Sequence, residues 1–161
     1  MVRRFTALIL TAVLIALDRA AKILAIRYLK PSGSKTIIKG ILDFRYVENT
    51  GAAFSFFQGK TIILIALTSV LLLAGLYALL WNKVKPGLLY TGFLLATAGG
   101  IGNFIDRITR GYVIDFIEPV FVDFAVFNLA DCLITVGAFI IIAYLVYDIY
   151  RDFRKARNEK P

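Results

Sequence analysis

The chain has 161 residues, of which 59% are hydrophobic, and its mean hydropathy of +0.75 excludes an ordinary soluble domain. Its formal net charge of +8 comes from Lys and Arg residues that flank apolar segments, so we expect membrane lipids with anionic headgroups as partners, and no nucleic acid. Because it has no histidine and one cysteine, the chain excludes Ser-His-Asp and Cys-His nucleophiles, His-based zinc sites and an intrachain disulfide framework.

Four apolar segments are each close to the roughly 20 residues that a helix needs to cross a bilayer. They are residues 5–26, 61–81, 87–105 and 128–147. The middle two contain no charged residue. We therefore predict one membrane-embedded domain over residues 1–161, built as an all-α bundle of four transmembrane helices.

The first of these segments also has features of a cleavable secretory signal peptide. Arg3 and Arg4 precede an apolar run from residue 5 to 17, and the small residues Ala20 and Ala21 follow it. This pattern is typical of the positive, apolar and cleavage regions of a signal peptide. Retention of the segment as a helix gives an even number of spans.

An even number of spans puts both termini on one side of the membrane, together with the short turn at residues 81–87. The segments 27–60 and 106–127 then lie on the opposite side. Lys and Arg residues nearly balance between the two sides, but their density in the short turn and in the tail after Arg151 favours a cytoplasmic location for the termini.

The segment between the first two helices, residues 36–57, is predicted to be rich in strand. LDFRYVEN at 42–49 alternates apolar and polar residues as a half-buried strand does. Asn49, Thr50 and Gly51 then indicate a turn, and the AFSFF that follows is apolar enough to rest on the membrane surface. We expect a small extracytoplasmic β-sheet over the helix ends.

Polar residues gather at the predicted outer ends of three helices. They are Asp18 and Lys22 in the first helix, Asn103, Asp106 and Arg107 in the third, and Asn128 and Asp131 in the fourth. Spacings of three or four residues put each group on one helix face. The glycines of GGIGN, residues 99–103, allow neighbouring helices to approach closely.

More ordinary structural roles also account for some of these residues. Asp18 and Lys22 could form an ion pair at the membrane interface, with the Lys22 side chain extended toward the headgroups. Asn128 could cap the fourth helix, because Asn is among the best N-cap residues, and Asp131 would then favour the helix dipole.

Two carboxylates held close together at a membrane face share one proton, because both cannot readily ionise in a medium of low dielectric. The anion can then activate water while its protonated partner assists the carbonyl oxygen and the leaving nitrogen. Asp131 is the first candidate for such a pair, although Asp106 beside Arg107 is more typical of a structural ion pair. The second carboxylate remains open among Asp106, Asp115, Glu118 and Asp123.

Five blocks of sequence, in this order, resemble those of the lipoprotein signal peptidase family, also called signal peptidase II. They are Asp18 with Lys22, NTGAAF at 49–54, GGIGNFIDR at 99–107, VIDF at 113–116 and FNLAD at 127–131. The resemblance implies a four-helix aspartic endopeptidase of the bacterial cytoplasmic membrane with its active site near the outer face. It also implies that the enzyme removes signal peptides from diacylglyceryl-modified prolipoproteins before the lipidated cysteine.

The resemblance selects Asp115 and Asp131 as the catalytic pair. It assigns supporting or substrate-binding roles to Asp18, Lys22, Asn49, Gly99, Asn103, Arg107 and Asn128. The chain departs from the family at Arg19, where Gln is usual, and at Ala21, where a hydroxyl residue is usual. We expect a monomer without metal or organic cofactor, inhibited by globomycin. Removal of residues 1–21 as a signal peptide would delete Asp18, which counts against cleavage.

Two alternatives come from other functional classes. A small transporter or proton-conducting bundle would also use carboxylates within the membrane, but its polar residues should be distributed across the bilayer. The segment 61–81 offers only Thr61, Thr68 and Ser69, and the last helix beyond Asp131 offers little besides Thr135. A structural membrane subunit is the second alternative, and it would tolerate the loss of either aspartate.

Overall fold

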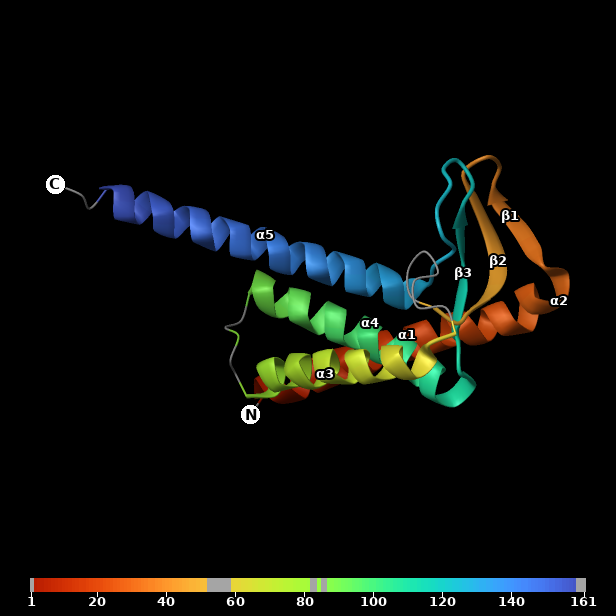
Figure 1. The fold of residues 1–161 in the computed structure, drawn as a ribbon, viewed down its shortest axis with the longest axis horizontal. Coiled ribbons are helices and arrows are strands. Elements are labelled where there is room, and N and C mark those ends of the chain that lie inside the picture. The colour runs from red at the N-terminus through yellow and green to blue at the C-terminus, as the bar shows by residue number, and fades with distance from the viewer. Residues whose placement is uncertain (1, 52–58, 82–83, 85–86, 159–161) are drawn as a thin grey trace.

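The structure is a computed structural model that describes residues 2–51, 59–81, 84 and 87–158. Its long helices are α1 (Val2–Leu24), α3 (Thr61–Leu80), α4 (Leu88–Arg110) and α5 (Leu129–Asn158). A small sheet lies at one end of the helices, whereas the start of α1 and the end of α5 lie toward the other end (Figure 1). The predicted pattern of mostly helical structure with a small sheet is confirmed at this level.

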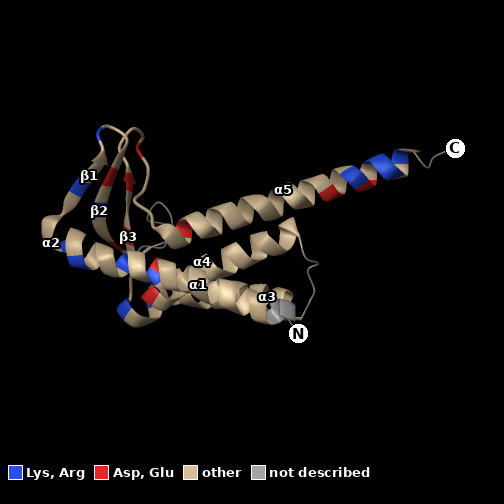
Figure 2. Cartoon of the chain, turned by 180° about the vertical axis from the view of Figure 1, so that it is seen from behind, with Lys and Arg blue, Asp and Glu red and all other residues tan. Residues whose placement is uncertain are grey.

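Among the residues that the structure describes, three helices, α3, α4 and α5, are long and apolar enough to cross a membrane. The second half of α1 includes Asp18, Arg19 and Lys22, which lower its apolar character. In Figure 2 the charged residues gather at the sheet end of the bundle and along the last turns of α5. Between these two regions the helices are largely uncharged, as expected for segments surrounded by lipid.

α4 is the central helix, in contact with α1, α3 and α5. Three glycines in the second half of α4 face three different neighbours. A Cβ atom at Gly99 would overlap the backbone carbonyl oxygen of Ala130 in α5, one at Gly100 would lie 2.9 Å from Leu72 Cδ2 in α3, and one at Gly102 would lie 2.6 Å from Asp18 Oδ2 in α1. The missing side chains let the polar ends of these helices meet.

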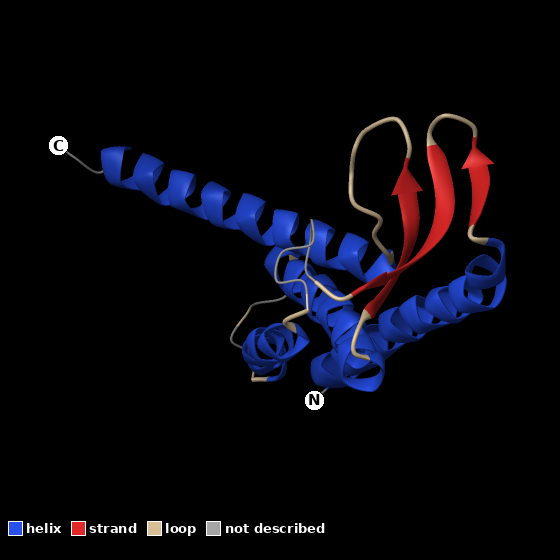
Figure 3. Cartoon of the chain, turned by 45° about the vertical axis from the view of Figure 1, so that its right-hand side comes forward, coloured by secondary structure: helices blue, strands red, loops and turns tan. Residues whose placement is uncertain are grey.

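The sheet is antiparallel, in the order β1 (Ser34–Ile38), β2 (Leu42–Asn49) and β3 (Val113–Pro119). Its strands run across the direction of the helices, as Figure 3 shows. The segment predicted to be rich in strand, residues 36–57, contains two strands. The first begins at Ser34, before the predicted start, and the second ends at Asn49. Residues 52–58 lie outside the described part. The segment 106–127, for which no strand was predicted, contributes β3, which pairs with β2.

The helices extend beyond their predicted ends. α1 continues into a π-helical turn, η1 (Ala25–Leu29), and a short turn, α2 (Lys30–Ser32), that leads to β1. α4 passes the predicted end at residue 105 and stops before Gly111, whose φ of 82° suits a glycine. α5 passes residue 147, since its exposed polar tail supports further turns through pairs such as Arg151 with Asp148 at 2.7 Å.

Candidate active site

Asp115 lies on β3, near the end of the strand that is closest to the helices. Its neighbours from Val113 to Phe116 are buried, and Asp115 itself is 1% exposed. In the sheet register Asp115 is opposite Val47, which brings Asn49 at the end of β2 close to it. Asn49 Nδ2 donates to Asp115 Oδ2 at 2.8 Å. The sheet therefore holds a buried carboxylate at the ends of the helices.

The second oxygen of Asp115 accepts a hydrogen bond from Asn128 Nδ2 at 2.6 Å. Burial and, to a smaller extent, the nearby charge of Asp131 raise the pKa of Asp115, whereas the two amide donors lower it, and the net result is a pKa of about 6. This value lies far enough above the ordinary 3.8 to let the carboxyl hold a proton under mildly acidic conditions.

Asp131 lies in the first turn of α5 and forms a reciprocal cap with Asn128, which precedes the helix. The Asp131 backbone N–H donates to Asn128 Oδ1 at 3.0 Å, and the Asn128 backbone N–H donates to Asp131 Oδ2 at 3.1 Å. The capping role considered for these residues is confirmed. It leaves Asp131 Oδ1 to accept a hydrogen bond from Asn103 Nδ2 at 2.7 Å.

Asp115, Asp131, Asn103 and Asn128 form one hydrogen-bonded cluster, which we call the Asp–Asn cluster. Asn128 contacts both carboxylates, and its side-chain amide also lies 3.2 Å from Asn103 Oδ1. Three elements contribute to the cluster: β3, α4 and the start of α5. Asn128 thus links a buried carboxylate on the strand to a partly buried one in the first turn of α5.

Lys22 lies beneath this cluster as a completely buried cation. Its Nζ atom is 2.8 Å from Asn103 Oδ1, 3.0 Å from Asp18 Oδ2 and 2.9 Å from Asp106 Oδ2. Three acceptors match the three N–H groups of an ammonium. The alternative of a Lys22 side chain extended toward lipid headgroups is therefore wrong, because its partners lie inside the bundle.

Asp18 connects α1 to the start of α5. Its Oδ1 atom accepts a hydrogen bond from the Ala130 backbone N–H at 3.0 Å. That N–H belongs to the first turn of α5, where backbone donors lack partners within the helix. A contact between side chain and backbone at this position could not be recognised from the sequence, because the two residues are 112 positions apart.

Asp106 pairs with Arg19, Lys22 and Arg110. The interpretation that Asp106 pairs with its neighbour Arg107 is wrong, since consecutive residues point to different sides of a helix. Asp106 Oδ2 also lies 3.4 Å from the Ile114 backbone nitrogen at the start of β3. Asp106 therefore ties α1 and α4 to the strand that carries Asp115.

Arg107 holds the segment that follows β2. Its Nη2 atom donates to the Gly51 carbonyl oxygen at 3.0 Å, and the Gly51 N–H donates to Asn49 Oδ1 at 2.9 Å. The second contact forms the turn predicted at residues 49–51. The AFSFF stretch that follows this turn lies outside the described residues.

The structure places the four carboxylates that the sequence left as candidates for the second member of the pair at different positions. Asp115 is at the base of β3 beside the cluster, and Asp106 belongs to the ion pairs around Lys22. Glu118 is near the other end of β3 and pairs with Arg45 at 3.2 Å. Asp123 is exposed in the connection between β3 and α5. Within the described part of the chain, no three His, Cys, Asp or Glu side chains gather as metal ligands.

The sequence is similar to proteins of known function over most of its length. The family model described as signal peptidase (SPase) II matches residues 10–147. A lipoprotein signal peptidase from Caldanaerobacter subterraneus subsp. tengcongensis is 44% identical over 87% of this chain and 94% of the relative. One from Lactobacillus johnsonii is 38% identical over 90% of this chain and 94% of the relative.

The fold is also similar to solved structures. A bacterial membrane enzyme solved at 2.3 Å by the in meso method has a TM-score of 0.82 with 29% identity, over 96% of this chain and 92% of that chain. A second, solved at 1.9 Å, has a TM-score of 0.79 with 30% identity, over 89% of this chain and 94% of that chain.

Proposed function

Since the chain belongs to the signal peptidase II family, it is a multi-pass inner-membrane protease that processes lipoproteins, and we propose that it works as an aspartic endopeptidase. Its substrates are prolipoproteins whose cysteine carries a diacylglyceryl group. Cleavage occurs directly before that cysteine. The whole chain acts as one peptidase unit.

The observation that supports this mechanism is the contact of one residue with two carboxylates. Asn128 donates its side-chain amide to Asp115 and its backbone N–H to Asp131. A residue that contacts both carboxylates keeps them near each other. In the described part of the chain Asp115 and Asp131 are the two carboxylates of the Asp–Asn cluster, and we assign them as the catalytic pair.

In the reaction the pair carries one proton. The ionised carboxylate removes a proton from a water molecule, and the resulting hydroxide attacks the carbonyl carbon of the scissile peptide bond. The protonated carboxyl donates a hydrogen bond to the carbonyl oxygen as negative charge develops there. When the tetrahedral intermediate collapses, a proton passes to the leaving nitrogen of the cysteine, and the C–N bond breaks.

The surrounding residues keep this pair in place. Asn103 and Asn128 orient Asp131, and Asn49 and Asn128 orient Asp115. Gly99 lets α5 approach α4. Lys22 forms ion pairs with Asp18 and Asp106 and donates a hydrogen bond to the side-chain oxygen of Asn103. Arg107 secures the turn that carries Asn49.

In the membrane we propose four spans, with α1 as the first, and both termini in the cytoplasm. The sheet and the Asp–Asn cluster then lie at the outer face. A precursor anchored by its signal helix and its diacylglyceryl group can reach this site sideways from the lipid. The sequence that connects α3 to α4, on the proposed cytoplasmic side, contains Lys83 and Lys85, as the positive-inside rule favours.

The direct test is processing of a diacylglyceryl-modified precursor by the purified chain in lipid, followed as a gel shift. We expect conversion to the shorter product, inhibition by globomycin and no inhibition by a metal chelator. The same precursor without the lipid should be processed poorly. Equal turnover of both precursors would overturn lipid-dependent recognition, and inhibition by the chelator would overturn a mechanism that uses carboxylates alone.

A further inference from the structure

The far end of the sheet combines two loops that are distant in sequence. The turn between β1 and β2 and the connection between β3 and α5 meet there, where the Val120 N–H donates to the Ile41 carbonyl oxygen at 3.0 Å. We call residues 37–41 and 120–124 the sheet tip. In Figure 1 both loops lie far from the bases of the strands, which contact the helices.

The sheet tip exposes an unusual amount of apolar surface for a segment outside the long helices. The exposed fractions are 43% for Ile37, 49% for Ile38, 51% for Ile41, 41% for Val120, 70% for Phe121, 48% for Val122 and 48% for Phe124. Exposed apolar residues that cluster in this way mark a site of interaction with a protein or a membrane.

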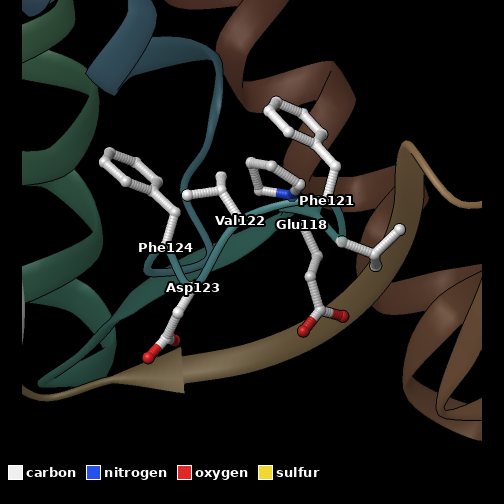
Figure 4. A pocket seen from close by; sticks show the side chains of 7 residues that line it. Glu118, Phe121, Val122, Asp123 and Phe124 are labelled. Atoms are coloured by element: carbon white, nitrogen blue, oxygen red, sulfur yellow. The ribbon is translucent and has the colours of Figure 1, made fainter.

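The connection between β3 and α5 has two unlike sides. Figure 4 shows the rings of Phe121 and Phe124 on one side of the backbone, while the carboxylates of Glu118 and Asp123 point to the other. Residues 118–124 line a shallow hollow of about 430 Å³. An element with one apolar and one acidic side is suited to lie at a boundary between lipid and water.

The direction of the sheet decides which partner this surface meets. α3, α4 and α5 are long and apolar enough to cross the bilayer, so their axes run roughly along the membrane normal. The strands run across these axes from the helix ends, and the sheet tip projects sideways past the start of α5 (Figures 1 and 3). At that level, beside the bundle, the neighbouring material is the headgroup region of the bilayer.

We propose that the sheet tip docks on the surface of the bilayer, with Phe121 and its apolar neighbours inserted at the boundary between headgroups and acyl chains. Aromatic and branched aliphatic side chains are favoured at this depth. Lys39 in the tip and Lys35 next to it are exposed, so both can pair with lipid phosphates. Because β3 runs from the sheet tip to Asp115, this contact fixes the depth of Asp115 in the membrane.

The insertion can be tested with a fluorescent side chain at the tip. Trp81 is the single tryptophan of the chain, so Trp81→Phe gives a silent background for Phe121→Trp. The full chain is placed in nanodiscs at one copy per disc, with lipids brominated high on the acyl chain. We expect a blue-shifted emission that is quenched by the bromolipid and protected from aqueous iodide.

Asp123→Trp in the same background is the matched control, because Asp123 points to the opposite side of the connection. Its emission should be red-shifted, quenched by iodide and insensitive to bromolipid. Iodide quenching of both tryptophans to the same extent would overturn the proposal. A blue shift of Phe121→Trp that needs two copies per disc would also overturn it, in favour of contact between copies. These readouts do not depend on peptidase activity.

Discussion

The side-chain amide of Asn128 lies 2.6 Å from Asp115 Oδ1, so the residue that caps α5 also binds the carboxylate on β3. A helix cap is a local structure, formed by residues within one turn. Here it is joined to a strand that pairs with a segment more than 60 residues earlier in the chain. The geometry of the proposed catalytic pair therefore depends on how the sheet sits against the helix start.

Replacement of either proposed catalytic carboxylate should abolish processing. Asp115→Asn and Asp131→Asn keep the size of the side chain but cannot share a proton as a carboxyl pair does. Both variants should insert in the membrane and retain the melting behaviour of a folded chain, with no detectable shift of a lipidated precursor on a gel. Near-normal product from either variant would refute the assignment.

Asp123→Asn is the control for these two variants. Asp123 is an exposed carboxylate eight residues after Asp115 and outside the Asp–Asn cluster. Its replacement changes the net charge by the same amount. We expect the parental rate, so a loss of activity in the other two variants cannot be ascribed to charge.

The two roles of Asn128 can be separated by substitution. Ser retains an oxygen that caps α5 but lacks the amide that reaches Asp115, whereas Ala lacks both. Both variants should lose about 10- to 100-fold in kcat, the equivalent of a hydrogen bond to a charged group. Both variants lose the buried amide contact, and Asn128→Ala should lose about 1 kcal/mol more stability than Asn128→Ser because it also lacks the cap.

These expectations are checked by precursor turnover and thermal unfolding of the same preparations. Parental kcat in Asn128→Ser would show that the contact between Asn128 and Asp115 has no part in catalysis. Equal stability of the Ser and Ala variants would contradict the capping role.

Much of the fold follows from the sequence because its signals are local. A run of about 20 apolar residues must be a helix in lipid, since only internal hydrogen bonds satisfy its backbone there. The strand at 42–49 was recognisable by its alternation. β3 was not, because its residues from Val113 to Phe116 are all buried and lack the alternation of a half-exposed strand. Its pairing with β2 is a long-range contact.

The candidate site was predictable only in part. The spacing of Asn128 and Asp131 indicates a helix cap, but the choice of Asp115 among four carboxylates came from the resemblance to a family. The burial of Lys22 could not be inferred, because it depends on Asp106, which is 84 positions later in the sequence. The pairing of Arg19 with Asp106 requires the same packing of α1 on α4.

The raised pKa of Asp115 predicts how stability should vary with pH. With a pKa of about 6 in the folded chain and 3.8 as its ordinary value, Asp115 binds more protons when folded than when unfolded. Its contribution to stability is complete below the lower value and is lost as the pH rises through the upper one. The loss amounts to at most about 3 kcal/mol.

Asp115→Asn removes this titration. Melting temperatures in detergent should therefore fall less between about pH 4 and pH 7 for the variant than for the parental chain. The loss of a hydrogen bond in the variant lowers its melting temperature at every pH, so the change of melting temperature with pH is compared rather than the melting temperature itself. Parallel slopes would mean that Asp115 has the same proton affinity in the folded and unfolded chains.

Gly99 and Gly100 are adjacent but should respond differently to a methyl group. At Gly99 the added Cβ would overlap the Ala130 backbone carbonyl, which cannot move without displacing α5. At Gly100 it would meet the end of the Leu72 side chain at 2.9 Å, which can rotate. Gly99→Ala should cost about 1–3 kcal/mol of stability, the usual cost of overpacking.

Because Ala130 is next to Asp131, Gly99→Ala should also lower the turnover of the lipidated precursor. Gly100→Ala is the matched control and should keep activity close to the parental value. Thermal unfolding and precursor processing test both statements, and a more severe defect at Gly100 would contradict the packing of α4 on α5.

Lys22 and Arg19 both pair with Asp106, and the difference in their burial predicts unequal effects on stability. Lys22→Met removes a completely buried cation and leaves Asp18 without its ion-pair partner, so we expect a loss of about 3–5 kcal/mol. Arg19 is 22% exposed in its side chain, and Asp106 keeps Lys22 and Arg110 without it. Arg19→Gln, which removes the charge but keeps a polar side chain, should cost less than about 1 kcal/mol. Unfolding of both variants in one detergent measures the difference, and comparable losses would mean that Lys22 does not hold Asp18 and Asp106 together.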